Sequence, residues 1–138
     1  MNQTDLESFV TGLPDVQRVD NPDLGYTFFF VGDDHRLPFV SIANSDNDFD
    51  NVSDLNREGV FRLNIGVSRE TFDKLVGGSD LEDVDYSVLD VFLPHPHYAP
   101  QNFVCILNPA GDNVEATKRL IEEAHSIAEA RMQRKAKG

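Results

Sequence analysis

The stretch GVFRLNIGVSRETFDKLVGG, residues 59–78, decides the fold class because it joins a strand directly to a helix. Apolar side chains alternate along residues 59–67, which predicts a strand with two different faces. One face carries Phe61, Leu63, Ile65 and Val67, and the other carries Val60, Arg62, Asn64 and Gly66. Ser68 is a favourable helix N-cap, and Gly77-Gly78 ends the helix. The stretch therefore predicts a sheet with helices packed on one face.

The flanking sequence extends this pattern in both directions. Upstream, a helix with Thr4 and Glu7 as a capping pair precedes strands predicted over 16–20, 26–31 and 38–43. Downstream, residues 79–101 are irregular, 103–107 form a continuously apolar strand, and a long helix starts at Asp112 and ends in a basic tail, 131–138. The order α-β-β-β-β-α-β-α predicts one two-layer α+β domain over residues 1–138. We expect a mainly antiparallel sheet of about five strands with helices on one face.

The composition limits the partners. The 138 residues include 24 Asp and Glu but only 12 Lys and Arg, for a net charge of −12. Such a surface repels nucleic-acid phosphates and acidic membranes, so neither is an expected partner. The acidity fits salt adaptation or a specific partner, and the sequence leaves both open. A single cysteine, Cys105, and the absence of a long apolar run predict a soluble cytoplasmic protein without an internal disulfide.

Two polar clusters invite a metal hypothesis. Asp46, Asp48 and Asp50 resemble the start of a calcium loop, but the sixth position is Asn51 and the twelfth is Arg57 instead of Gly and Glu. His95-x-His97 is a weak transition-metal pattern, and proline-flanked histidines also order loops by bonding backbone groups. We therefore predict no metal site, with the three aspartates as weak candidates. No dinucleotide, P-loop or metalloprotease motif occurs, so no cofactor is predicted.

Candidate binding residues fall into two groups. Arg62 and Asn64 share the sheet face opposite the predicted helices, and Phe29, Val31 and Phe39 join them in one choice of register. In the alternative, loop 79–101 covers this face and Arg62 pairs with an aspartate. The second group is His95, His97, Tyr98 and Asn102, in the proline-rich segment before the last strand.

Two segments resemble a bacterial family of unknown function. Residues 53–67, SDLNREGVFRLNIGV, and 93–109, LPHPHYAPQNFVCILNP, are similar to that family's FRLNIGV-type strand and its HPxY…(W/F)VxxLNP segment. More distantly, Tyr98 and 103–107 resemble the Y-x-x-x-x-W-x-x-V-x-L strand of MmcQ/YjbR-like domains. That resemblance implies a two-layer fold with an antiparallel sheet, as in secretion-chaperone-like domains. It also implies DNA binding, which conflicts with the net charge of −12.

Two functional hypotheses follow. The first is a non-enzymatic cytosolic domain that binds an unidentified protein or small molecule and is compatible with a homodimer. The second is a small enzyme or metal-dependent protein with a site at His95, His97, Tyr98 and Arg62. Convergence of the two histidines and Arg62 on one concave pocket would favour the second hypothesis. Solvent-facing histidines and a flat apolar sheet face would favour the first.

Overall fold

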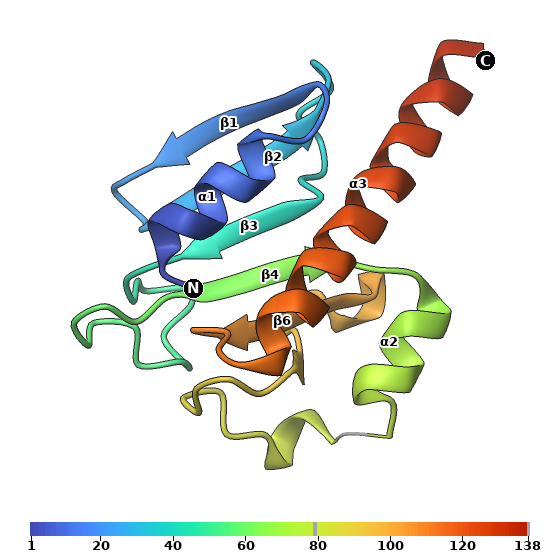
Figure 1. The fold of residues 1–138 in the computed structure, drawn as a ribbon. Coiled ribbons are helices and arrows are strands. Elements are labelled where there is room, and N and C mark those ends of the chain that lie inside the picture. The colour runs from blue at the N-terminus through green and yellow to red at the C-terminus, as the bar shows by residue number, and fades with distance from the viewer. Residues whose placement is uncertain (79, 138) are drawn as a thin grey trace.

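The computed structural model describes residues 1–78 and 80–137. Within these residues the helices are α1 (Gln3–Thr11), α2 (Arg69–Val76) and α3 (Asp112–Lys137) (Figure 1). The strands are β1 (Val16–Asn21), β2 (Tyr26–Val31), β3 (Val40–Ala43), β4 (Arg62–Gly66), β5 (Leu93–Pro94) and β6 (Phe103–Leu107). Two short 3₁₀ turns, η1 (Leu81–Asp83) and η2 (Ala99–Gln101), flank β5. Of the irregular segment predicted over 79–101, residue 79 lies outside the described residues.

The strands form one open antiparallel sheet in the order β1-β2-β3-β4-β6-β5. The predicted α+β class is confirmed. The sheet has six strands where about five were expected, because the two residues of β5 pair with β6 at one edge. Two residues in a proline-rich segment carry too little alternation to predict a strand.

Helices α1 and α3 lie over one face of the sheet, and α2 lies near its β5–β6 end (Figure 1). The core forms between these helices and β4, whose Leu63 and Ile65 are fully buried. Ile121, Ala124 and Ala128 of α3 contribute to the same core. The predicted inward face of β4 is therefore confirmed. The predicted basic tail continues α3 through Lys137, and residue 138 lies outside the described residues.

The strand register corrects one expectation. Phe29 pairs with Val40, which pairs with Ile65, so Phe29 lies on the helix-covered face. Val31 and Phe39 also belong to this core instead of the face of Arg62 and Asn64. The aromatic residues that do share the face of Asn64 begin with Phe28, which pairs with Ser41. The sequence left this register open, and the pairing of β2 with β3 shows which face of β2 the helices cover.

Helix boundaries follow local capping chemistry. The capping box of α1 is formed by Asn2 and Asp5, not by Thr4 and Glu7: the Asn2 side chain accepts a hydrogen bond from the Asp5 backbone N–H, and Asp5 Oδ2 accepts from the Asn2 N–H. Asn2 lies one residue before the helix, whereas Thr4 is already inside it. The predicted cap of α2 is confirmed, because Ser68 Oγ accepts from the Thr71 N–H at 3.1 Å.

Candidate functional site

A row of side chains crosses the sheet face opposite the helices. The register aligns Phe28, Ser41, Asn64, Cys105 and Leu93 across β2, β3, β4, β6 and β5. Directly paired residues of antiparallel strands project to the same side, so the five form one row. At its centre, Asn64 donates from Nδ2 to the Oγ of Ser41 at 3.1 Å. This bond joins β3 to β4 through side chains and places small polar groups between larger apolar ones.

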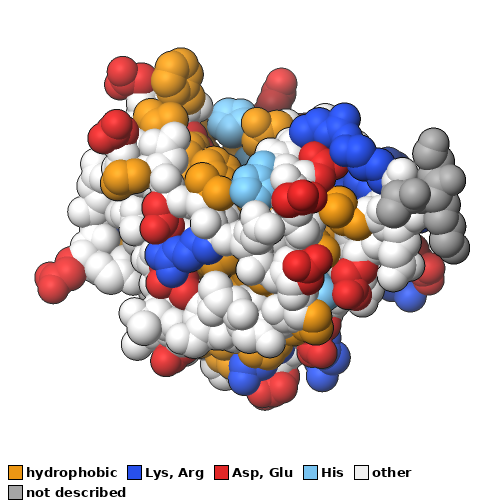
Figure 2. All heavy atoms as spheres, turned by 90° about the horizontal axis from the view of Figure 1, so that it is seen from above, with side chains coloured by type: hydrophobic (Ala, Val, Ile, Leu, Met, Phe, Trp, Pro, Cys, Tyr) orange, Lys and Arg blue, Asp and Glu red, His pale blue; other side chains and the backbone are white. Residues whose placement is uncertain are grey.

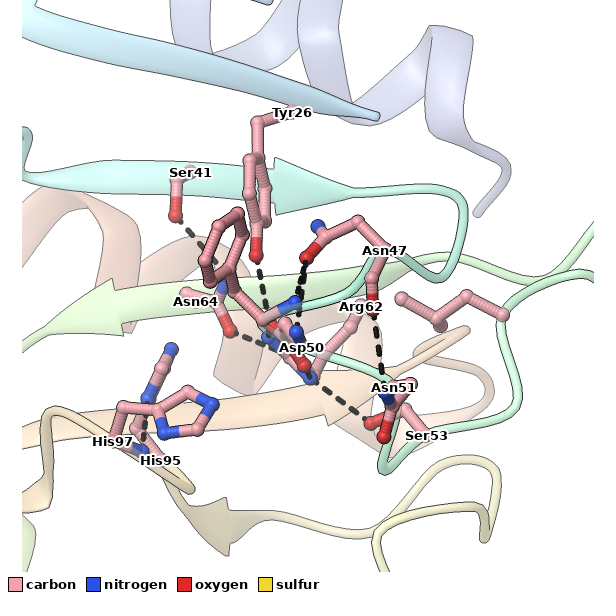
Figure 3. A network of polar contacts seen from close by, with 12 residues as sticks. Tyr26, Ser41, Asn47, Asp50, Asn51, Ser53, Arg62, Asn64, His95 and His97 are labelled. Carbon is pink, nitrogen blue, oxygen red and sulfur yellow. Dashed lines mark hydrogen bonds and ion pairs between the residues drawn. The ribbon is translucent and has the colours of Figure 1, made fainter. Parts of the chain in front are cut away.

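Arg62 anchors a buried polar network beside this row (Figure 3). Its Nη1 donates to Asp50 Oδ1 at 3.0 Å and to Ser53 Oγ at 3.0 Å. Its Nη2 donates to the second oxygen of the same carboxylate, and its Nε donates to Asn64 Oδ1 at 3.0 Å. Tyr26 donates its hydroxyl to Asp50 Oδ2 at 2.9 Å. The network therefore holds the Asp-rich loop between β3 and β4 against the sheet.

The ion pair between Arg62 and Asp50 is removed from solvent, with relative exposures of 0% and 4%. Burial by itself raises the pKa of the Asp50 carboxyl, but the hydrogen bonds and charge of Arg62 outweigh it, so the net shift is downward. Burial by itself lowers the pKa of the Arg62 guanidinium, but the hydrogen bonds and charge of Asp50 outweigh burial, so the net shift is upward. Both groups are therefore ionised and neutralise each other inside the protein. The alternative in which Arg62 pairs with an aspartate is confirmed, and the aspartate, Asp50, comes from loop 44–56.

His95 is fixed by its own backbone neighbours. Its Nδ1 accepts hydrogen bonds from the backbone N–H groups of His97 and Tyr98, each at 2.9 Å. An imidazole nitrogen that accepts carries no proton, so the neutral ring of His95 has its proton on Nε2. Burial lowers the pKa of His95 to about 3, with a further contribution from the charge of Arg62. His95 is thus a neutral hydrogen-bond donor through Nε2 at physiological pH.

These groups surround a cavity of about 620 Å³. Its polar floor contains Ser41, Asn64, Arg62, Asp50 and His95. Aromatic rings stand on both sides: Tyr26 and Phe28 from β2, and Tyr98 and Phe103 around β6. Phe49 also lines the cavity and is 79% exposed, while Tyr98 is 56% exposed. Rings that remain this exposed beside a concave surface are characteristic of a binding site.

The aromatic walls stand on strands that are well separated. Three interstrand spacings, about 14 Å in total, lie between β2 and β6. Tyr26 and Phe28 contact each other at 5.5 Å between ring centroids, and His95 contacts Tyr98 at 5.1 Å. The space between the walls is therefore wide enough for a flat ring system. In the space-filling view, hydrophobic and histidine side chains gather near the top of the visible face, whereas Lys and Arg side chains are spread over several separate places (Figure 2).

Five of the six predicted binding residues line this cavity: Arg62, Asn64, His95, His97 and Tyr98. The sixth, Asn102, does not. It ends the η2 turn in a left-handed conformation with φ of 64°, and its carbonyl accepts from the Val67 N–H at 3.1 Å. Asn102 therefore shapes the backbone of the η2 turn. The structure brings Arg62 and Asn64 of β4 together with His95, His97 and Tyr98, which the sequence could not connect.

Sequence reasoning missed Tyr26, Phe28, Ser41 and Phe49 as cavity residues. The period of two in a strand places Tyr26 and Phe28 on one face and Phe29 on the other, but the sequence YTFFFV does not show which face is open. Ser41 is signalled only by its pairing with Asn64. Phe49 stands in a polar loop, where an exposed aromatic residue is unusual enough to mark a contact surface.

The three metal candidates do not converge. Asp46 Oδ1 accepts from the Leu55 backbone N–H at 3.0 Å, Asp48 is exposed, and Asp50 pairs with Arg62. Among residues 1–78 and 80–137, no group of three or more His, Cys, Asp or Glu side chains is arranged to hold a metal ion. The Asp-x-Asp-x-Asp pattern instead orders its own loop and supplies the partner of Arg62.

Fold and site together define an α+β domain with an aromatic-walled cavity on the helix-free face of its sheet. The chain belongs to a family of unknown function, DUF6194, whose model matches residues 1–137. Comparison with curated proteins found no match, and comparison with solved structures found none either. The similarity to MmcQ/YjbR-like domains therefore stays a prediction. In the described part of the chain, no helix is long and apolar enough to cross a membrane.

Proposed function

We propose that this domain is a non-enzymatic binding protein whose ligand is a small molecule held in the cavity between β2 and β6. One observation carries the proposal: five of the six predicted residues line one concave space together with three further exposed or half-buried aromatic rings, Tyr26, Phe28 and Phe49. A volume of about 620 Å³ is in the range of small-molecule sites, which are mostly apolar with a few placed polar groups.

The polar groups of the floor support binding over catalysis. Arg62 is fully buried and neutralised by Asp50, so it does not present a free charge to a substrate. His95 is neutral, and its Nδ1 is occupied by two backbone donors, so it is a poor proton acceptor. Floor groups whose charges and acceptor atoms are already paired within the protein can orient a ligand, but they do not exchange protons with it.

The proposal is tested by screening aromatic fragments against ¹⁵N-labelled protein by two-dimensional NMR. We expect shifts at the backbone amides of Ser41, Asn64 and Tyr98. Phe49→Ala should weaken binding roughly tenfold, since stacking on one ring contributes about 1–1.5 kcal/mol. Because the Phe49 side chain is 79% exposed, its loss should leave the melting temperature nearly unchanged.

The matched control is Leu81→Ala, which removes another exposed apolar side chain outside the cavity lining. It should leave affinity unchanged. If fragments shift no cavity residue, or if Leu81→Ala weakens them as much as Phe49→Ala does, the cavity is not the binding site.

The competing hypothesis is an enzyme, and one observation favours it: His95, His97 and Arg62 do share one concave pocket. His97 is exposed, and its ring makes no hydrogen bond with the described part of the chain. It would be the proton-transfer group of such an enzyme. NMR spectra of each bound fragment over many hours distinguish the two functions. Conversion of a fragment by the wild type but not by His97→Ala would replace the binding proposal.

We further propose a cytoplasmic location and a partner that is neither nucleic acid nor membrane. The buried free thiol of Cys105 is compatible with a reducing compartment, and the net charge of −12 opposes binding to phosphate backbones. A homodimer is compatible with the remaining surface. Sedimentation equilibrium at several concentrations, with and without a bound fragment, measures that state directly.

A further inference from the structure

The hydrogen bonds within the cavity floor indicate which functional group of a ligand the floor can bind. This inference rests on the proposed function and concerns the ligand's chemistry. Each strong acceptor on the floor is already occupied within the protein. Asn64 Oδ1 accepts from Arg62 Nε at 3.0 Å, and His95 Nδ1 accepts from two backbone N–H groups. Both oxygens of Asp50 accept from Arg62, and one of them also accepts from Tyr26.

The groups that remain are donors. Ser41 Oγ accepts from Asn64, so its own hydroxyl hydrogen is left to point elsewhere. Asn64 has two amide hydrogens, and one is used in that bond. The neutral ring of His95 carries its proton on Nε2, which makes no hydrogen bond with the described residues. Ser41 and Asn64 are direct cross-strand partners on β3 and β4, whereas His95 follows Pro94 of β5, on the far side of β6 (Figure 3).

The charges around the floor favour a neutral ligand over an ion. On the floor, Arg62 is cancelled by Asp50. At the rim, Arg36 binds Asp34 through Nε at 3.0 Å and Nη2 at 3.1 Å and shares this carboxylate with Lys135, so these cations are held outside the floor. An anion entering this space would lose its hydration without gaining an unpaired cation on the floor. The overall charge of −12 adds repulsion at longer range. A carbonyl oxygen accepts two hydrogen bonds without this cost.

We propose that the cavity binds an uncharged aromatic molecule through a carbonyl group, with the carbonyl oxygen accepting from the bonded pair Ser41 and Asn64 and the ring lying between the aromatic walls. The donors select the functional group, and Tyr26, Phe28, Phe49 and Tyr98 contact the ring system. The space of about 14 Å between β2 and β6 includes the walls themselves, so a two-ring compound is a suitable probe.

Three isosteric probes test the proposal: 2-acetylnaphthalene, 2-isopropenylnaphthalene and 2-naphthoate. The second replaces the carbonyl oxygen by a methylene group, and the third replaces the methyl group by a charged oxygen. We expect 2-acetylnaphthalene to bind about tenfold more tightly than the methylene compound, because one net hydrogen bond is worth roughly this factor. It should also bind more tightly than the naphthoate. Dissociation constants come from NMR titrations of the full chain at pH 7.

The Ser41→Ala variant tests whether the cavity floor causes the preference for the carbonyl probe. Ser41→Ala removes one donor and should lower the ratio of the two neutral probes' affinities about threefold, a fraction of one hydrogen bond. The ratio is the readout because a general loss of packing weakens both neutral probes alike. Ser126→Ala, an exposed serine of α3, is the matched control and should leave the ratio unchanged.

The outcomes separate this inference from the proposed function. Equal affinity for the two neutral probes, or tighter binding of the naphthoate, overturns the carbonyl assignment while cavity binding stands. An unchanged ratio in Ser41→Ala also overturns the assignment of the donors. If none of the three probes binds but other fragments shift cavity residues, only this inference fails. If nothing shifts those residues, the proposed function fails with it.

Discussion

Arg62 and Asp50, twelve positions apart in the sequence, meet as a buried side-chain pair in which Nη1 donates to Oδ1 and Nη2 donates to Oδ2 of the carboxylate. The contact attaches the loop that carries Phe49 to the central strand β4. One wall of the cavity therefore depends on an electrostatic contact in its floor. The sequence left two possibilities for Arg62, an open sheet face or a pair with an aspartate. Its full burial against Asp50 shows the second.

Removing one member of this pair should strongly destabilise the fold. Arg62→Met or Asp50→Asn leaves its partner buried without a counter-charge, which costs about 3–5 kcal/mol of the free energy of unfolding. The double variant should lose less than the sum of the two single losses, since no unpaired charge remains. Urea denaturation of the four proteins measures this coupling.

The exposed pair of Arg69 and Asp73 on α2 provides the control, with a separation of 3.2 Å but side-chain exposures of 75% and 53%. The corresponding Met and Asn changes there should leave stability nearly unchanged. Additive losses at Arg62 and Asp50 would contradict the assignment of a coupled pair.

The neutral state of His95 should make the protein less stable in mild acid. Its pKa is about 3 in the folded protein and 6.5 when unperturbed, so between these values the unfolded chain binds a proton that the folded chain does not. Stability should therefore fall as the pH decreases from about 6.5, by at most about 1.4 kcal/mol per pH unit from this group. The charges around the ring are Arg62 and His97, which lower its pKa, and Asp50, which raises it.

Urea denaturation between pH 7 and pH 5 measures this slope, above the range in which Asp50 titrates. His95→Asn keeps an acceptor near the position of Nδ1 and removes the titrating ring, so its slope should be smaller by about one proton. His35→Asn changes an exposed histidine and should retain the wild-type slope. Equal slopes in wild type and His95→Asn would show that His95 is not the group responsible.

Gly66 leaves room for the ring that supports the β6 wall. A Cβ atom at this position would lie 2.9 Å from Phe103 Cζ, so Gly66→Ala forces the ring to move. We expect a loss of about 1–3 kcal/mol, as for other overpacked sites, and NMR shift changes at His95 and Tyr98, whose rings contact Phe103. Adding Phe103→Leu should relieve the clash, so the double variant should be no less stable than Phe103→Leu alone. A further loss in the double variant would place the conflict elsewhere.

Cys105 should be chemically silent in the folded protein. It is fully buried in β6, and burial raises the pKa of its thiol to about 12. We expect no reaction with an aromatic disulfide reagent until urea unfolds the chain. A cysteine placed at the exposed Ser126 position should react at once and serves as the control. Rapid labelling of native Cys105 would mean that the segment covering β6 opens without global unfolding.

The alternation in residues 59–67 was sufficient to predict the two faces of β4, and the capping and glycine signals around α2 were sufficient to predict its start and end. The site was only partly predictable. Asn64 and Ser41 became neighbours through strand pairing, which a single sequence does not specify. The pattern of Asp46, Asp48 and Asp50 suggested one shared role, whereas the fold assigns one aspartate to a loop turn and another to Arg62. Contacts between segments distant in the chain account for each of these differences.

Pro94 has a consequence for how copies of this protein can meet. It occupies the edge strand β5, has no amide hydrogen, and its carbonyl accepts from the Tyr86 hydroxyl at 2.8 Å. An incoming β-strand would find neither a donor nor a free acceptor at this residue. The sheet is therefore closed to extension at Pro94, so a second copy cannot add a strand through backbone hydrogen bonds at this position of the β5 edge.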